Sequence, residues 1–264
     1  MSNRVVVITS EGLEQQYVTN LICAAVPVEA IFVTDQPPGR SWKTVLKNNP
    51  LEFVEKGLRR LMLKLIGDAR DHDRQLRRVL GEADCAAFHE TDKLIYVGRP
   101  KKGLLRKEIE RLEPDFLVIY GTGIIPDSVL SKARKKAFNM HTGISPYYRG
   151  TACAFWPIHE GEPEMVGATV HECTSAVDGG EIYRTAKATL YRGDTLHAVF
   201  ARAAKAGAQA YVEVVKDAVA GRLTGHSQDL SVGREFSGAM RGLKQEIRAR
   251  TRLRKMRRAW PVEP

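Results

Sequence analysis

Apolar and polar positions along this chain follow a pattern that predicts alternating strands and helices. Short continuous apolar runs rich in β-branched residues are typical of buried parallel strands. Such runs occur at 4–9, 28–33, 93–97 and 115–120. Between the first two runs, apolar residues recur at helical spacing from Glu14 to Ala25, which predicts a helix. A strand, a helix and a second strand in this order favour a parallel sheet covered by helices.

The second half of the chain extends this pattern. Further strands are predicted at 136–140, 166–173 and 181–190. Asp194 and Thr195 are typical capping residues for a long helix that continues to about Ala220. We therefore predict an α/β fold with a Rossmann-like, mostly parallel twisted sheet flanked by helices.

A helical insertion interrupts this pattern at about 38–81. From Leu51 to Gly81 the chain has the periodicity of an amphipathic helix. Its apolar stripe comprises Leu58, Leu61, Met62, Leu65 and Ile66. Because apolar stripes on helices usually face a core, we expect this one to contact the body of the protein rather than a partner.

Composition excludes several classes of protein. The chain has 264 residues, of which 43% are hydrophobic, enough to form one large domain with a core. It contains no run of about 18 apolar residues, which excludes a membrane-spanning helix, and its start does not resemble a signal peptide. The four cysteines lie far apart in sequence, which favours reduced thiols and a cytoplasmic protein. No group of His, Cys and acidic residues has the spacing of a metal site, so we expect no metal.

The net charge of +10 is concentrated at the C-terminal end. Residues 234–264 hold ten Lys and Arg against three acids, so we assign 1–225 to the main domain and 226–264 to a basic C-terminal extension. Two apolar faces are predicted on its helix: Met240, Leu243 and Ile247 on one, and Leu253, Met256 and Trp260 on the other. The interpretation we favour is a helix that docks on the body through these faces. Binding of nucleic acid or of an anionic membrane surface are the alternatives.

The residues with the clearest chemical potential lie where the predicted strand at 136–140 ends. Asn139 and His141 share one face, because strand side chains alternate. Ligands of open α/β sheets sit at the carboxyl ends of strands. There an amide can donate to an oxyanion, and an imidazole can move a proton near neutral pH. Asp178, in a later Gly-rich loop, could orient the imidazole and raise its pKa. From these residues alone, a structural histidine and an ordinary Asp-Gly-Gly turn are the more frequent explanation of the pattern.

Taken together, three motifs resemble the folate-dependent formyltransferases. They are Asn139-x-His141, the loop from Ser145-Pro146 to Arg149-Gly150, and Asp178-Gly-Gly about 40 residues later. This family includes glycinamide ribonucleotide transformylase, methionyl-tRNA formyltransferase and the sugar N-formyltransferases. The resemblance covers roughly 85–220 and is absent over 38–80.

The resemblance implies that Asn139, His141 and Asp178 form a catalytic trio and that 10-formyltetrahydrofolate is the formyl donor. It also implies an oxyanion stabilised by Asn139 and by a protonated His141 whose charge Asp178 maintains. The implied pterin cleft has two segments, comprising Tyr120, Gly121, Thr122, Gly123, Ile124 and Ile125, and Thr174, Ser175, Ala176, Val177, Gly179 and Gly180.

Departures from the family pattern bear on the acceptor. The segment after the first strand carries Glu11 and Glu14 where glycinamide ribonucleotide transformylase has a phosphate loop. Only 44 residues follow about Ala220, too few for the C-terminal domain of methionyl-tRNA formyltransferase. We therefore expect the amine or hydroxylamine of a small metabolite, such as an amino sugar nucleotide, as acceptor. Tyr148 and Arg149 are candidate substrate contacts.

Two alternatives stay open at this point. One is a hydrolase of the same formyl donor, in which water replaces the amine. The other is a protein that uses the fold as a scaffold to bind nucleic acid or a membrane. The sequence does not distinguish a monomer from a homodimer.

Overall fold

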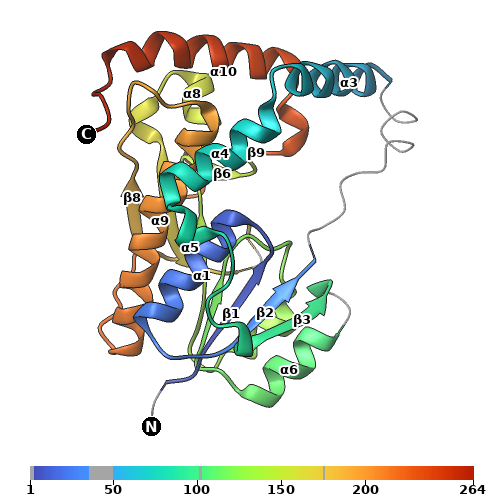
Figure 1. Ribbon diagram of the computed structural model, residues 1–264. Coiled ribbons are helices and arrows are strands. Elements are labelled where there is room, and N and C mark those ends of the chain that lie inside the picture. The colour runs from blue at the N-terminus through green and yellow to red at the C-terminus, as the bar shows by residue number, and fades with distance from the viewer. Residues whose placement is uncertain (1–2, 36–49, 101–102, 175) are drawn as a thin grey trace.

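The computed structural model describes residues 3–35, 50–100, 103–174 and 176–264 (Figure 1). A sheet of seven strands in the order β3-β2-β1-β4-β5-β7-β8 forms its centre. The strands are β1 (Val5–Ser10), β2 (Val28–Thr34), β3 (Leu94–Gly98), β4 (Phe116–Ile119), β5 (Lys136–His141), β7 (Gly167–Glu172) and β8 (Ile182–Lys187). The first five strands in the sheet are parallel, and β7 and β8 join the β5 edge antiparallel. The predicted α/β fold with a mostly parallel sheet is confirmed.

Helices cover both faces of this sheet. One face packs against α1 (Leu13–Ala25), α4 (Asp68–Leu80), α5 (Glu82–Cys85) and α9 (Leu196–Val219). The other face packs against α6 (Leu104–Leu112) and α7 (Asp127–Leu130). Short 3-10 helices are η1 (Thr91–Lys93), η3 (Pro163–Met165), η4 (Gly238–Met240) and η5 (Arg257–Ala259). Apolar contacts with helices cover both faces of the sheet. A site can therefore form at the edge where the carboxyl ends of the parallel strands lie.

The alternation of side chains along β5 places the candidate residues. Phe138 and Met140 belong to the core beneath α1 and α9, whereas Ala137 belongs to the core on the α6 and α7 face. Asn139 and His141 therefore point to the same side as Ala137, as the period of two predicts.

A third core lies beyond the sheet, around α8 (Trp156–Glu160) and the start of α9. There β6 (Tyr148–Gly150), directly after the candidate motif, pairs in parallel with β9 (Arg234–Phe236) from the C-terminal segment. The sequence analysis did not predict these two strands. Three residues each are too few to show an alternation, and the partners are far apart in the chain.

The helical stretch predicted at 51–81 is broken at Gly67, which adopts a left-handed φ of 67°. It forms two helices, α3 (Pro50–Leu65) and α4. The expectation that the apolar stripe faces the core is wrong for α3, because Leu58, Leu61 and Leu65 are 51%, 54% and 77% exposed. The stretch is long enough for its first helix to project past the body (Figure 1). The part of the predicted insertion at 38–49 lies outside the described residues.

The basic tail helix, α10 (Leu243–Met256), docks on the body and against α3. Leu253 is buried, and Met256 and Trp260 pack against the third core, so docking through this predicted face is confirmed. Met240 and Ile247, on the other predicted face, are half exposed.

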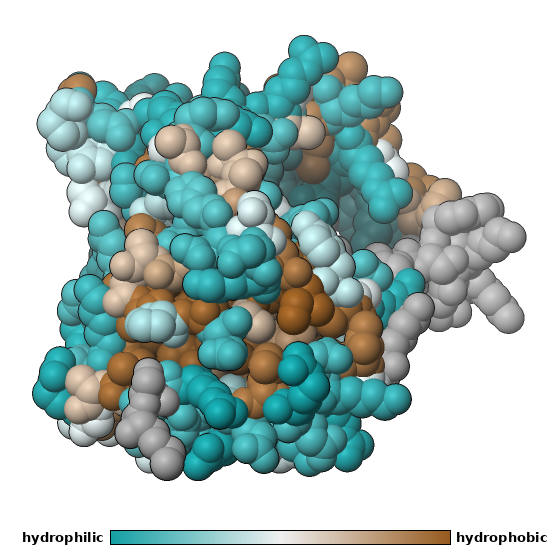
Figure 2. Space-filling view, turned by 60° about the horizontal axis from the view of Figure 1, so that its bottom comes forward, coloured by the Kyte–Doolittle hydropathy of each residue, from teal (hydrophilic) through white to brown (hydrophobic). Residues whose placement is uncertain are grey.

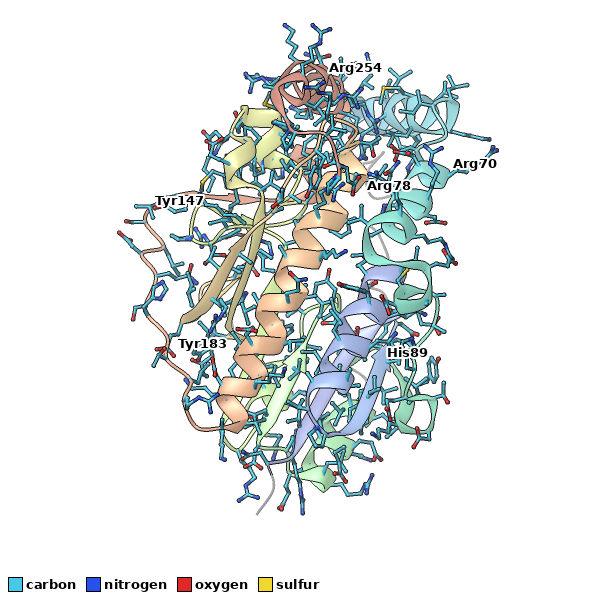
Figure 3. All side chains as sticks on the ribbon, turned by 60° about the vertical axis from the view of Figure 1, so that its left-hand side comes forward. Arg70, Arg78, His89, Tyr147, Tyr183 and Arg254 are labelled. Carbon is cyan, nitrogen blue, oxygen red and sulfur yellow. The ribbon has the colours of Figure 1, made fainter. Side chains whose placement is uncertain are left out.

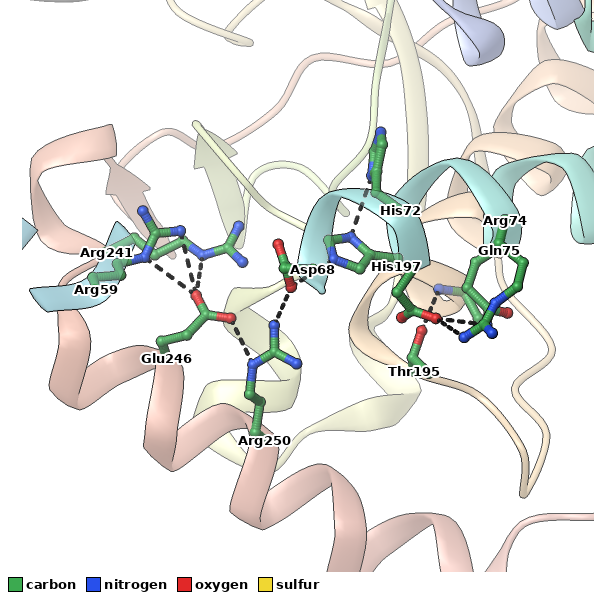
Figure 4. Close-up of polar contacts among 12 residues, drawn as sticks. Arg59, Asp68, His72, Arg74, Gln75, Thr195, His197, Arg241, Glu246 and Arg250 are labelled. Atoms are coloured by element: carbon green, nitrogen blue, oxygen red, sulfur yellow. Dashed lines mark hydrogen bonds and ion pairs between the residues drawn. The ribbon is translucent and has the colours of Figure 1, made fainter. Parts of the chain in front are cut away.

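A buried carboxylate joins α10 to α3 (Figure 4). The Glu246 carboxylate is fully buried and accepts hydrogen bonds from Arg241 and Arg250, each through Nε at 3.0 Å. The guanidinium of Arg59 on α3 lies 3.4 Å away. Arg250 also bonds Asp68, at the start of α4. Polar contacts therefore hold α10 against α3, next to the predicted apolar face of α10 that is exposed to solvent. Within the described ranges, none of the helices is both long enough and apolar enough to cross a bilayer.

Candidate active site

Asn139 and His141 lie at the end of β5, and a side chain of α9 fixes the ends of β4 and β5 to each other. The buried hydroxyl of Tyr211 accepts a hydrogen bond from the Ile119 N–H at 2.8 Å. The same hydroxyl lies 2.8 Å from the Phe138 carbonyl and 3.1 Å from the Ile119 carbonyl. One side chain thus ties the last residues of β4 to the residue that precedes Asn139.

The loop after β7 brings Asp178 to the same place. Asp178 has a left-handed backbone (φ 46°), and its Oδ2 lies 3.4 Å from Nδ1 of His141. The Gly150 N–H donates to that oxygen at 2.8 Å. Gln228, from the C-terminal segment, holds the loop by donating to the carbonyls of Asp178 and Gly180 at 2.8 and 2.6 Å. The structure therefore brings the predicted trio together, although its members come from two separate elements.

Asp178 is ionised at neutral pH. Burial by itself would raise the pKa of this carboxyl, but His141, His171 and the Gly150 N–H lower it to about 2. The site therefore contains a fixed negative charge beside two imidazoles.

The electrostatics of His141 differ from the expectation that Asp178 keeps it charged. The ring is almost completely buried, and burial lowers its pKa below the ordinary value, although Asp178 raises it in part. His141 is therefore neutral at neutral pH. Its Nε2 lies 3.0 Å from the Tyr148 carbonyl, while Nδ1 faces Asp178. A neutral ring can donate to only one of these acceptors, whereas a ring that gains a proton satisfies both.

His171 is a residue of the site that was not among the candidates named from the sequence. Its Nδ1 lies 2.7 Å from the Glu172 carbonyl, which is a hydrogen-bond acceptor. Nε2 lies 3.3 Å from the Asn139 amide nitrogen and 3.4 Å from Oδ1 of Asp178. The signal that could have revealed it is the strand register, in which Asn139 opposes His171 across the β5–β7 pair.

The turn after His141 depends on two residues that the sequence analysis did not single out. Thr169 donates to the Gly143 carbonyl at 2.8 Å and accepts from the Ser145 N–H at 3.0 Å. A Cβ on Gly143 would lie 2.4 Å from His141 Nε2 and 2.5 Å from the Cβ of Cys153. Only glycine fits here, because the backbone passes directly under the imidazole.

The two segments predicted to line a pterin cleft follow β4 and β7, the two neighbours of β5. Ile124 is 81% exposed and Val177 is 46% exposed, so each segment presents an apolar side chain to solvent. The backbone groups of Ile124 and Ile125 make no hydrogen bond with a described residue. Apolar side chains next to free backbone donors and acceptors suit a flat heterocycle with polar edges, so these segments fit the folate head group. Tyr120 is buried, and Ser175 lies outside the described residues.

The predicted acceptor contacts lie differently. The Tyr148 ring is buried against Phe236, with ring centroids 5.7 Å apart, and its hydroxyl donates to Glu162 at 2.6 Å. Its contribution to the site is its carbonyl, which faces His141. Arg149 donates to the Pro146 carbonyl at 3.2 Å and bridges to the C-terminal segment. Tyr147 is half exposed and points away from the body (Figure 3). Among the described residues, no group of three or more His, Cys, Asp and Glu is arranged to hold a metal ion.

Comparison with known families assigns the central part of the chain. Residues 88–215 match the family model described as formyl transferase, and this segment contains the whole trio. Over this segment, which is just under half of the chain, the sequence is similar to formyl transferases. Its site residues lie on β5 and on the loop after β7, both within the matched segment.

Curated proteins similar to part of this chain include methionyl-tRNA formyltransferases. The enzyme from Listeria welshimeri is 30% identical over 123 residues, which are 46% of this chain and 39% of the relative. The enzyme from Chlorobium chlorochromatii is 33% identical over 120 residues, 46% of this chain and 38% of the relative. The chain thus spans about two fifths of the length of these relatives.

Solved structures with the same fold have other acceptors in their names. A sugar N-formyltransferase from Shewanella sp. has a TM-score of 0.58 and 14% identity, covering 95% of this chain and 87% of its own. Phosphoribosylglycinamide formyltransferase from Anaplasma phagocytophilum has a TM-score of 0.54 and 15% identity, covering 84% and 89%. At this identity the likeness establishes the fold, which extends over nearly the whole chain.

Proposed function

We propose that this protein is an enzyme that transfers a formyl group from 10-formyltetrahydrofolate to the amine of a small biosynthetic metabolite. The observation that carries the proposal is the contact of Asp178 with His141 beside Asn139, at the end of β5. The match to the formyl transferase family over 88–215 supports it. A sugar 3N-formyltransferase of similar fold (TM-score 0.56, 14% identity) was solved in the presence of dTDP and 5-N-formyltetrahydrofolate.

The donor supplies an activated formyl carbon when it is bound between the segments after β4 and β7. Asn139 then provides an amide N–H for the oxygen that gains negative charge. A positioned donor of this kind contributes about 3 to 4 kcal/mol to transition-state stabilisation. The Asn139 amide nitrogen now rests 3.3 Å from His171 Nε2, which holds it beside the reaction centre.

His141 acts as the base for the attacking amine. Because burial lowers its pKa, the neutral imidazole is available at neutral pH to accept the proton that the amine loses. The ionised carboxylate of Asp178 would stabilise the imidazolium, which can return the proton to the folate nitrogen as the bond between that nitrogen and the formyl carbon breaks, so that the products are the formylated amine and tetrahydrofolate. This assignment replaces the protonated resting state that the resemblance implied.

The turn after β1 argues for a small acceptor other than a ribonucleotide phosphate. Glu11 occupies this turn and accepts a hydrogen bond from Tyr96 at 3.2 Å. A carboxylate there repels the phosphate that the corresponding loop of glycinamide ribonucleotide transformylase holds. Formylation of methionyl-tRNA and hydrolysis of the donor are the two competing activities, and both are measurable in the same assay.

The test is a spectrophotometric assay for release of tetrahydrofolate from 10-formyltetrahydrofolate. Separate arms contain dTDP-linked amino sugars, a hydroxylamine, charged initiator tRNA, or no acceptor. Turnover that requires a small amine supports the proposal. Formate release without an acceptor would establish the hydrolase, and turnover that requires tRNA would establish the tRNA enzyme.

Variants identify the residues responsible. Asn139→Ala and Asp178→Asn should each lower kcat at least a hundredfold while the protein stays folded. His159→Gln is the matched control, because this histidine is also buried but pairs with Glu160 in α8. Full turnover in folded Asp178→Asn would overturn the assignment.

A further inference from the structure

The exposed side of α3 is an apolar stripe without a cover among the described residues. Leucine and valine recur on it at intervals of three and four, and all of them are at least half exposed. They are Leu51, Val54, Leu58, Leu61 and Leu65. Figure 2 shows apolar atoms gathered over α3, at the upper right beside the grey segment. An exposed apolar patch of this kind marks an interaction surface rather than an ordinary solvated face.

The outward side of α10 has the opposite chemistry. Its exposed positions also recur at helical spacing, and they include five cations and no carboxylate. The cations are Lys244, Arg248, Arg254, Lys255 and, just past the helix, Arg258. None of them has a carboxylate partner among the described residues, in contrast to the arginines on the inner side that hold Glu246. Figure 3 shows Arg254 on this outer side of α10, at the end of the molecule away from the N-terminus.

The two stripes lie on neighbouring helices. α3 and α10 run along the same edge of the molecule (Figure 1) and are in contact. Glu246 binds Arg59 of α3 as well as Arg250 of α10, so the position of α3 relative to α10 is fixed. Between them and the start of α4 lies a cavity of about 600 Å³. Its lining is of mixed charge: the apolar side chains are Met62, Ile66 and Ile247, and the arginines Arg70, Arg74, Arg250 and Arg254 stand beside the carboxylates of Asp68 and Asp71.

We propose that this edge of α3 and α10 binds the surface of an anionic lipid bilayer. Leucines on one helix can enter the boundary between headgroups and acyl chains, and the neighbouring cations can contact phosphate groups. The protein would thus perform its chemistry next to a membrane. Membrane-linked metabolites of the proposed acceptor class would then lie within reach of its site.

Charge and hydrophobicity separate this partner from the two competing ones. A nucleic acid would satisfy the cations of α10 but would leave the leucines of α3 in water. A second copy would cover the leucines but would bring two basic α10 faces near each other, in a chain that already carries +10. An anionic bilayer satisfies both stripes at once.

The test is co-sedimentation of the full chain with phosphatidylcholine vesicles, with and without phosphatidylglycerol. We expect binding only to the anionic vesicles, and weaker binding as salt is raised. Arg248→Gln/Lys255→Gln should weaken binding about thirtyfold, from about 1 kcal/mol for each cation near the surface. Leu58→Gln/Leu61→Gln should weaken it more than tenfold, because both side chains lose their apolar contact with the bilayer.

The control is Arg106→Gln/Lys107→Gln, which removes two exposed cations from α6, away from this edge. It should bind as the unchanged protein does, and circular dichroism should show that all three variants are folded. No binding to anionic vesicles would overturn the proposal, as would equal binding to neutral ones. Dimerisation in solution that the leucine variant abolishes, without vesicle binding, would establish the second copy instead. The proposed catalytic activity is tested separately, so the failure of one proposal leaves the other measurable.

Discussion

The variant Glu246→Gln tests whether one buried carboxylate joins the tail to the insertion. Gln has the same shape but no charge, and it leaves three guanidinium groups around a neutral amide. Two of the lost contacts are charge-assisted hydrogen bonds of 3.0 Å to Arg241 and Arg250, and the third is the 3.4 Å contact to Arg59. Breaking a buried ion pair by removing one partner typically costs about 3 to 5 kcal/mol. For a domain of this size, that cost should lower Tm by on the order of 10 °C.

Thermal unfolding followed by circular dichroism measures this effect. Glu108→Gln is the matched control, because Glu108 pairs with Arg111 at 3.0 Å on the exposed side of α6. That pair should contribute less than about 1 kcal/mol. The effect at Glu246 should also persist at high salt, since a buried pair is screened little. A Tm for Glu246→Gln within a degree of the control would refute the reasoning, and α10 would then be held by its apolar contacts alone.

Three further predictions concern the site and, in the last of them, also Asp68 at the start of α4. Tyr211→Phe should lower the free energy of unfolding, measured by chemical denaturation, by about 1 to 3 kcal/mol, because an N–H at the end of β4 loses its acceptor. An unchanged free energy of unfolding would show that water replaces the lost hydroxyl. Gly143→Ala should lower kcat strongly and stability by about 1 to 3 kcal/mol, since the new methyl displaces His141, and unchanged kcat would contradict this. Asp178 and Asp68 have pKa values lowered to about 2, so their stabilisation is complete above the unfolded value near 3.8 and is lost as pH falls toward 2. The free energy of unfolding, measured as a function of pH, should show this loss for the parent protein and a smaller loss for the Asp178→Asn variant.

Local pattern was sufficient to predict the central sheet and the shared face of Asn139 and His141, whereas the place of Asp178 beside them was implied only by the family resemblance. β-branched runs mark β1, β2 and β4, and alternation along β5 correctly puts Asn139 and His141 on one face. These features depend on neighbours a few residues apart, which the sequence displays directly.

What the sequence could not supply depends on contacts between distant segments. His171 became a site residue through its register opposite Asn139, and no spacing in the chain reveals a register. The pKa of His141 depends on how deeply the ring is buried, and this outweighs the neighbouring carboxylate. On α3, an apolar stripe predicted a core contact but is exposed, because periodicity identifies an apolar face without identifying what covers it.

The pairing of β6 with β9 has a consequence for the order of events during synthesis. Gly150, which donates to Asp178, is hydrogen-bonded through β6 to a strand that begins only at Arg234. All three members of the trio therefore leave the ribosome before the segment that fixes the loop between them. A nascent chain stalled before Arg234 should be able to form the central sheet but not the finished site. Catalytic competence would then appear as a late and separate step of folding, observable as activity that lags behind the gain of secondary structure.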